Sequence, residues 1–307
     1  MNDLANPLVS VVIPSYNHGR FLGRALQSLL NQTYTNWEAI VIDNHSTDNT
    51  DEVMAKFADP RITYLKIHND GVIAASRNAG IRAAKGEWIA FLDSDDWWTN
   101  DKLKVCFDRV DEKVDLIYHD LEIVSDQSRT FRKKKVKSWQ VKEPVLRDLL
   151  LRGNAISNSS VVVRKRLLEE MGGINESIKL IAAEDYNAWL RISKRTNQFL
   201  YLPRKLGYYL MHNQSLSKKD MSEPYLEAIN EFTDVLSSRQ RRFVECKAMY
   251  MSGRYYYLRN ENKVASIKLQ KSLVGGISEV RFKAVFMLMV IVFKESFITL
   301  LCKKRLF

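Results

Sequence analysis

Short apolar runs alternate with amphipathic stretches through the first hundred residues. Four runs have the length and the β-branched or aromatic content of buried strands: residues 9–13, 38–42, 62–67 and 88–92. Three helical patterns lie between them: residues 19–30, about 48–57, and 73–84. Apolar strands separated by helices are typical of a parallel sheet covered on both faces, so we expect an α/β fold.

Polar side chains follow three of these four strands. They are Pro14, Ser15, Tyr16 and Asn17 after the first strand, residues 43–46 after the second, and residues 93–96 after the fourth. Ligands of parallel α/β sheets bind at the carboxyl ends of the strands. The pattern therefore predicts a binding site at this edge of the sheet.

The stretch after the fourth strand places Asp93, Asp95 and Asp96 within four positions. Like charges this close repel each other unless a cation offsets them, and carboxylate oxygens suit Mg²⁺ or Mn²⁺. If the motif stood alone, a solvated acidic turn would be the favoured explanation. The polar residues at the neighbouring strand ends favour the metal site.

The periodicity loosens after residue 118. Strand character returns at residues 157–163, a helix is expected at 184–193, and residues 208–217 form a polar-aromatic strand or loop. The chain is predicted to be helical from residue 221, with a turn near 260–262 between two helices. An apolar stretch at 284–302, interrupted by Lys294 and Glu295, favours a helix in the membrane interface over a buried helix or a span, since a span needs about 20 predominantly apolar residues.

A net charge of +11 indicates an anionic partner, such as nucleic acid, an anionic membrane surface or a phosphate-bearing substrate. The basic residues are dispersed, with neither zinc-ligand spacing nor an RNA-binding aromatic motif, so nucleic acid is not expected. A basic run at residues 129–137 is either a solvated loop or a contact for an anionic acceptor or headgroup. Three widely spaced cysteines and the lack of a signal-peptide pattern predict a reducing, cytoplasmic location.

Six motifs occur in a fixed order at residues 9–17, 28–34, 41–50, 75–80, 91–96 and 183–186. Together they resemble family 2 glycosyltransferases of the GT-A fold, particularly bacterial enzymes of cell-surface polysaccharide and lipopolysaccharide synthesis. The resemblance implies a mostly parallel central sheet flanked by helices. It also implies a catalytic domain at residues 1–220, with a nucleotide-binding half (about 8–118) and an acceptor half (about 119–220), followed by a helical region (221–307).

The resemblance implies a nucleotide-sugar donor, which would contact Pro14, Ser15, Tyr16 and Asn17. Asp43 would accept the imide N–H of uracil or, alternatively, cap its own turn. Asn44 and His45 stand where the family usually has Asp and Gly, so recognition of the base differs in detail. Arg77 would bind phosphate or form a surface ion pair.

The acidic motif would hold the donor and Mn²⁺ or Mg²⁺. Asp95 is expected as the direct metal ligand, Asp93 would face the ribose or the metal, and Ser94 would line the donor site. Asp96 is either an outer-shell partner or a cap. His212 would approach the metal or diphosphate, or is structural; Leu210 replaces the Arg that usually precedes it.

Asp185 resembles the catalytic base of the family, and Glu184 would bind the donor sugar or orient the site. Two acidic residues at a helix start would otherwise be explained by the helix dipole.

The resemblance thus implies an inverting enzyme that moves one sugar from a UDP-hexose or UDP-N-acetylhexosamine to a hydroxyl of a lipid-linked or lipopolysaccharide-type saccharide. It would work at the cytoplasmic face of the inner membrane. The absence of a Gln-x-x-Arg-Trp motif argues against a processive synthase. Alternatives are a polyprenyl-phosphate sugar synthase and, less favoured, a non-catalytic membrane-binding or nucleic-acid-binding protein.

Overall fold

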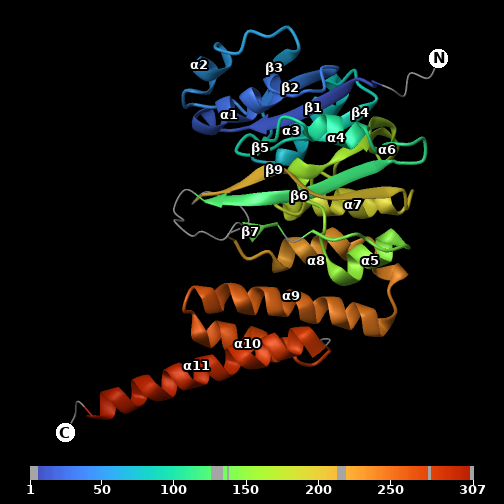
Figure 1. Cartoon of the computed structure of the whole chain (residues 1–307). Helices are drawn as coiled ribbons and strands as arrows, with labels where there is room; N and C mark the ends of the chain where they lie inside the picture. The colour runs from blue at the N-terminus through green and yellow to red at the C-terminus, as the bar shows by residue number, and fades with distance from the viewer. Residues whose placement is uncertain (1–5, 126–133, 137, 213–218, 276–277, 305–307) are drawn as a thin grey trace. The chain divides into compact units, whose positions relative to one another are not determined.

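A mixed sheet organises the first part of the chain (Figure 1). The computed structural model describes residues 6–125, 134–136, 138–212, 219–275 and 278–304. The chain divides into unit 1 (Met1–Ser215) and unit 2 (Leu216–Phe307). The predicted division of the catalytic domain into a nucleotide-binding half and an acceptor half stays a prediction.

The described strands of unit 1 are β1 (Val9–Ser15), β2 (Trp37–Asp43), β3 (Ile62–Lys66), β4 (Trp88–Phe91), β5 (Trp97–Trp98), β6 (Leu116–Ser125), β7 (Lys134–Lys135), β8 (Val162–Arg164) and β9 (Phe199–Met211). Its α-helices are α1 (Gly19–Leu30), α2 (Thr50–Met54), α3 (Ile73–Ala83), α4 (Lys102–Phe107), α5 (Val145–Arg152), α6 (Lys165–Glu170) and α7 (Glu184–Ser193). The sheet order is β3-β2-β1-β4-β8-β6-β9-β5, and β7 pairs with β6.

The parallel part of the sheet is confirmed for β3, β2, β1 and β4. In its register Ser15 lies opposite Asp43 and Val12 lies opposite Phe91. The polar segments after β1, β2 and β4 therefore leave the sheet at one edge. Beyond β4 the pairing is mixed, because β8 runs antiparallel to both β4 and β6 while β9 runs parallel to β6.

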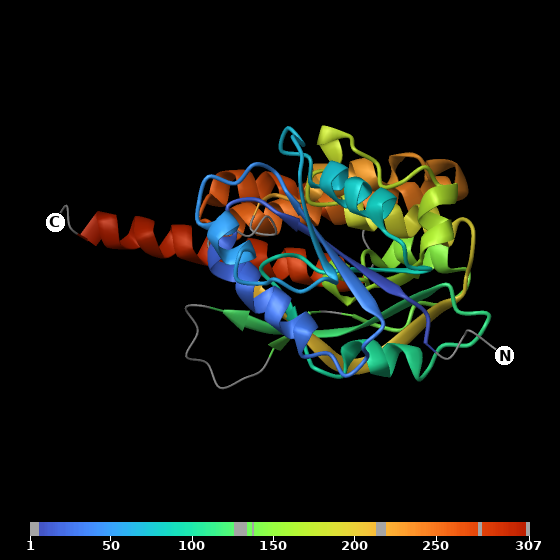
Figure 2. The same cartoon turned by 90° about the horizontal axis from the view of Figure 1, so that it is seen from above.

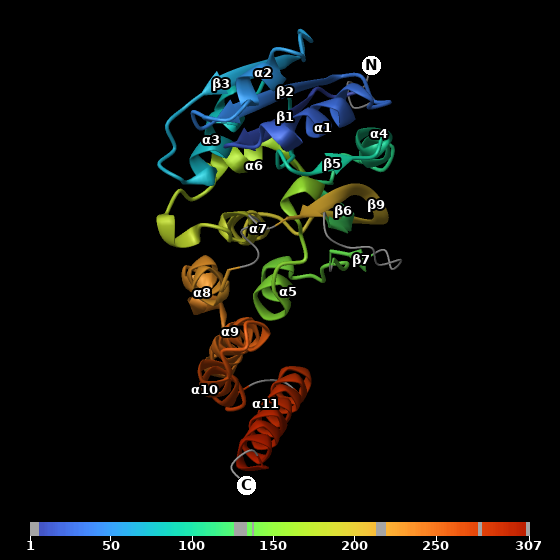
Figure 3. The same cartoon turned by 90° about the vertical axis from the view of Figure 1, so that its left-hand side faces the viewer.

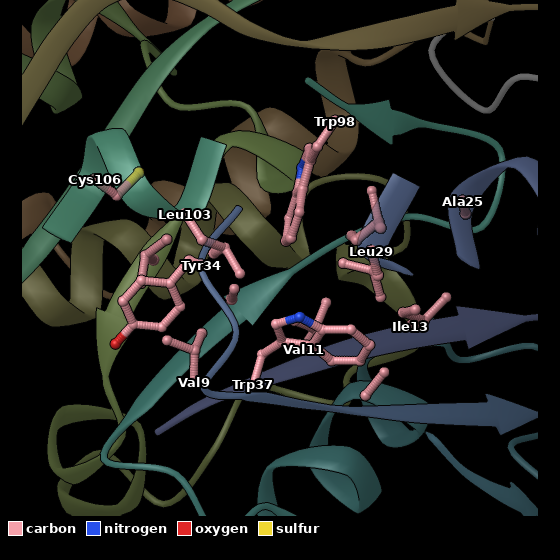
Figure 4. Close-up of a cluster of buried hydrophobic side chains, with 14 of the residues drawn as sticks. Val9, Val11, Ile13, Ala25, Leu29, Tyr34, Trp37, Trp98, Leu103 and Cys106 are labelled. Carbon is pink, nitrogen blue, oxygen red and sulfur yellow. The ribbon is translucent and has the colours of Figure 1, made fainter. Parts of the chain in front are cut away.

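Helices cover both faces of the parallel strands (Figure 2). Alternate residues of β1, such as Val9 and Val11, pack with Leu26 and Leu29 of α1 in the main core cluster (Figure 4). On the other face α3 comes so close that a Cβ added at Gly80 would lie 2.5 Å from Val12. This two-sided burial explains why the strands are almost continuously apolar.

Two parts of unit 1 differ from the sequence prediction. Residues 157–163 were expected as a strand, but a 3₁₀ turn (Asn158–Ser160) precedes the short β8. Strand β9 begins nine residues earlier than expected, because Arg204 and Lys205 form ion pairs with Asp101 and Glu122 instead of following an apolar alternation. Residues 213–217 of the expected strand or loop lie outside the described residues.

The basic run at 129–137 also lies largely outside the described residues. Its described part includes β7, where Lys135 forms an ion pair with Asp120 of β6. This contact is internal, and the predicted contact with an anionic acceptor stays a prediction.

Unit 2 is helical, with α8 (Ser222–Asn230), α9 (Ser238–Leu258), α10 (Asn262–Ser272) and α11 (Ser278–Lys304). The predicted turn between two helices is confirmed between α9 and α10. These two helices and α11 lie side by side (Figure 3). Helix α11 continues through Lys294 and Glu295, so these residues interrupt the apolar pattern but not the helix. None of the helices, as far as their residues are described, is long and apolar enough to cross a membrane.

Candidate active site

A buried arginine joins three elements at the ligand edge of the sheet. Arg77 of α3 is only 3% exposed, and its Nη2 donates to Asp93 Oδ1 at 2.8 Å. Its Nη1 donates to Glu184 at the start of α7. Burial opposes the charge, but the carboxylates of Asp93 and Glu184 prevail and raise the pKa of Arg77 above its ordinary value.

Arg77 was predicted to bind phosphate or to lie in a surface ion pair. The surface ion pair is wrong, because the side chain is buried and both terminal nitrogens donate to carboxylates. The phosphate contact stays a prediction. Its geometry is that of a residue that positions Asp93 and Glu184. Sequence reasoning missed this pair, since Arg77 and Glu184 lie 107 positions apart.

Asp93 follows β4 directly and is fixed from two sides. Besides Arg77, Asn158 Nδ2 donates to its Oδ1 at 2.8 Å, and the backbone N–H of Asp93 donates to Ser159 Oγ at 3.1 Å. Its side chain remains 26% exposed. The Asp93 carboxylate is thus held in place by hydrogen bonds, and part of its surface remains accessible to a ligand.

Asp185 is the second residue of α7 and is partly exposed. Tyr186 donates its backbone N–H to Oδ1 at 2.6 Å, and Asn154 Nδ2 lies 3.5 Å from Oδ2. Burial, together with the charge of Glu184, raises the pKa of Asp185 to about 7 against the opposing effect of Arg77. A carboxylate with this pKa is suited to accept a proton near neutral pH.

Asp95 and His212 meet at the same edge. His212 Nε2 lies 2.9 Å from Asp95 Oδ2, which brings the end of β9 to the acidic motif. The described residues contain no cluster of three or more His, Cys, Asp or Glu side chains with metal-site geometry. A carboxylate and an imidazole are ligands that would suit Mn²⁺ or Mg²⁺, and the metal site stays a prediction.

His18 joins this group, although the sequence analysis did not single it out. Its Nδ1 lies 2.8 Å from Ser94 Oγ, and its ring packs edge-on against His212 with centroids 5.9 Å apart. Burial lowers the pKa of His18, so the neutral imidazole is favoured. The only available signal was its position directly after the polar segment that follows β1.

Asp96 points inward instead of toward the site. It is 1% exposed, and its Oδ1 accepts the backbone N–H of Leu210 at 3.0 Å. Burial and the neighbouring charges of Asp95 and Asp93 raise the pKa of Asp96 well above its ordinary value. The observed bond anchors β9 beside the acidic motif and is not the predicted cap of the segment that follows Asp96. The outer-shell role stays a prediction.

The segments after β1 and β2 are tied together. Asn17 donates its backbone N–H to Ser46 Oγ at 2.8 Å, and its Oδ1 accepts the N–H of Thr47 at 2.8 Å. Asp43 is fully buried and accepts both the N–H and the hydroxyl of Ser46. The carboxylate therefore caps its own turn, and a direct contact with uracil would require this turn to open.

The other predicted donor contacts differ in exposure. Tyr16 is 54% exposed at the end of β1 and is available to a planar ring. Pro14 lies within β1, and the buried hydroxyl of Ser15 has no hydrogen-bond partner in the described part of the chain. Of these three residues, Tyr16 has an exposed side chain, whereas Pro14 and Ser15 are buried.

Known proteins resemble this chain in sequence or in fold. In E. coli, the UDP-Glc:alpha-D-GlcNAc-diphosphoundecaprenol beta-1,3-glucosyltransferase WfgD is 30% identical over 82% of this chain and 91% of its own. The S. aureus TarS 1-349 structure with UDP-GlcNAc has a TM-score of 0.64 at 18% identity, covering 95% of this chain and 91% of that one. The Pyrobaculum calidifontis mannosyltransferase PcManGT, solved with GDP-Man and Mn²⁺, has a TM-score of 0.59 at 17% identity, covering 94% and 87%.

These structural likenesses establish the GT-A fold. The sequence model described as Glycosyl transferase family 2 matches residues 10–172, which is more than half of the chain. Together with the relative in E. coli, this match shows that the chain is a glycosyltransferase and belongs to glycosyl transferase family 2.

Proposed function

We propose that the protein transfers one sugar from a UDP-sugar to a hydroxyl of a lipid-linked saccharide, with inversion at the anomeric carbon. Support for the donor and acceptor classes comes from two E. coli relatives, WfgD and WfaP, whose names specify UDP-Glc and a diphosphoundecaprenol acceptor. The proposal extends to a UDP-hexose or UDP-N-acetylhexosamine donor and to an acceptor of cell-surface polysaccharide synthesis.

The observation that carries the proposal is the environment of Asp185. Its carboxyl group is partly exposed, has a pKa of about 7 and lies next to Glu184, which Arg77 holds. In the proposed step the acceptor hydroxyl oxygen attacks the anomeric carbon while Asp185 takes its proton. The bond from that carbon to the diphosphate oxygen breaks, and UDP leaves with the bonding electron pair.

We assign binding of the nucleotide-sugar donor to Asp93 and Tyr16. Arg77 and Asn158 fix Asp93 for a contact with the ribose or the sugar, and exposed Tyr16 offers a ring for the uracil. Asp95 and His212 would hold Mn²⁺ or Mg²⁺, which when bound offsets the charge of the diphosphate.

The replacement Asp185→Asn tests the proposal. We expect turnover to fall by about 10²- to 10⁴-fold, since an amide cannot take the proton, while affinity for UDP changes little. Asp108→Asn, an exposed acid that pairs with Lys104 of α4, is the matched control. A screen of UDP-sugars by calorimetry, with and without Mn²⁺, identifies the donor. Absence of binding to every UDP-sugar would contradict the proposal.

A polyprenyl-phosphate sugar synthase is the second candidate. Its acceptor is a phosphate, which attacks without losing a proton to the enzyme, so it does not need Asp185. Near-normal turnover of Asp185→Asn with a polyprenyl phosphate acceptor would support this reading instead.

The proposed location is the cytoplasmic face of the inner membrane, with peripheral attachment. Its support is the lipid-linked acceptor named for the relatives and the strong positive charge of the chain.

A further inference from the structure

Helix α11 carries a stripe of exposed large apolar side chains. The stripe residues recur every three or four positions, which places them along one face of the helix. They are Phe282 (75% exposed), Val285 (41%), Phe286 (56%), Met289 (48%), Val292 (61%) and Phe293 (74%).

Packing within unit 2 explains only the opposite face of α11. Ala284 and Ile291 are 0% and 1% exposed and join a cluster with Ala265 and Leu269 of α10. Met287 and Leu288 pack against the same cluster. The helix is therefore apolar on two sides, of which one stabilises unit 2 and the other is left in contact with solvent. A stripe of six such residues exceeds the scattered apolar exposure of ordinary surfaces.

The charge around this stripe is strongly positive. Residues 238–304, which span α9 to α11, contain 14 Lys and Arg but only four Asp and Glu, a net charge of +10. Residues 1–215 have a net charge of only +3. Nearly all of the excess charge of the protein thus lies in the helices that carry the stripe, a combination typical of interfacial helices at anionic lipid surfaces.

We propose that the stripe of α11 is a docking surface for an anionic phospholipid membrane. Phe282, Phe286 and Phe293 insert among the acyl chains at the interface, and the basic residues of α9 to α11 meet the headgroups. The choice of this partner rests on the proposed function, because a lipid-linked acceptor is presented at a membrane. A second copy of the chain is the other candidate occupant, but two surfaces with this charge repel each other at low salt.

The test is co-sedimentation with vesicles of phosphatidylcholine, with or without phosphatidylglycerol. We expect the full-length protein to bind the anionic vesicles at least about tenfold more tightly than the neutral ones, with an affinity that falls as salt is added. The double variant Phe286→Ser/Phe293→Ser should lose at least about tenfold in affinity for anionic vesicles.

The matched control is Leu258→Ser/Ile267→Ser, which removes two exposed apolar side chains of α9 and α10 outside the stripe. It should retain vesicle binding within about twofold. Light scattering measures self-association of each protein. Equal loss in the control, or binding that does not depend on lipid charge, would overturn the proposal. So would a wild-type dimer that ignores vesicles and dissociates in the stripe variant.

A second measurement avoids removing apolar surface. Phe293→Trp should show additional blue-shifted emission when anionic vesicles are added, and an unchanged spectrum would overturn the insertion. UDP-sugar titration on the same preparations separates the two proposals. Vesicle binding without any donor binding refutes the function alone, and donor binding with transfer but without vesicle binding refutes the docking surface alone.

Discussion

Two buried cations of unit 1 have opposite surroundings. Arg77 meets two carboxylates from different elements, which raise its pKa. Lys102 at the start of α4 is 0% exposed, and its Nζ lies 3.7 Å from the ring centroid of Trp98 without a hydrogen-bond partner among the described residues. Burial lowers the pKa of Lys102 to about 8. Burial of a cationic side chain therefore does not by itself indicate a functional site.

The candidate site differs because the charge of its buried arginine is paired with carboxylates from other elements of the fold. Around Arg77, one cation from α3 pairs with two carboxylates, one at the end of β4 and one at the start of α7, at the edge of the sheet where ligands bind. The titratable groups that interact with Lys102 are Cys106 of α4 and His119 of β6. Burial and the lysine charge lower the pKa of His119 to about 3. The first arrangement holds two carboxylates in place, whereas Lys102 has no hydrogen bond to a carboxylate among the described residues.

Removing the compensated cation should have the largest effect. Arg77→Met leaves Asp93 and Glu184 in a buried site without their shared partner, which costs about 3–5 kcal/mol of unfolding free energy. Urea denaturation measures the loss. Arg77→Lys keeps the charge and should lose less. A loss below about 1 kcal/mol for Arg77→Met would show that the network is not a compensated unit.

The next largest effect is expected at Asp95, which lies two positions after Asp93. Asp95→Ala should weaken Mn²⁺-dependent UDP binding by about 10- to 100-fold, because the proposed charged metal ligand is lost. Isothermal titration with UDP, with and without Mn²⁺, measures the change. Asp101→Ala, an exposed acid paired with Arg204, is the control. Equal affinities of wild type and Asp95→Ala in Mn²⁺ would remove Asp95 from the metal site.

The uncompensated cation should show the smallest effect and the opposite sign. Lys102→Met should stabilise the fold at pH 7 by roughly 1–3 kcal/mol, since it removes an unpaired buried ammonium. The folded pKa of about 8 lies below the unfolded value, so wild-type stability rises as the pH increases above about 8 and the advantage of the variant shrinks. Thermal unfolding at several pH values measures both. Destabilisation at pH 7 would show a hidden partner.

The sequence predicted the parts of the fold that local pattern determines. Apolar runs and helical stripes located β1 to β4 with α1 and α3, and their order placed Asp43 and Asp93 at one edge, as the register confirms. The start of β9 was missed because its charged residues are paired across strands, a stabilisation that leaves no apolar periodicity.

The candidate site was predictable as a set of residues and less so as a network. The family motifs singled out Arg77 and Glu184 separately, but only the folded chain shows that they are bonded to each other. His18 and Asn158 contribute through single contacts to Ser94 and Asp93, and an isolated His or Asn gives no local signal of such a contact.

The central claim is that Asp185 takes the proton from the attacking hydroxyl of the saccharide acceptor. The most direct measurement is the pH dependence of kcat/KM for sugar transfer in the wild type and in Asp185→Asn. Because the pKa of Asp185 is raised to about 7, the wild-type value should rise about tenfold per pH unit below pH 7 and level off above it. In Asp185→Asn, kcat/KM should be low and should not show this rise with pH below pH 7. A wild-type profile that is flat through pH 7, or a variant that keeps the rise, would contradict the account.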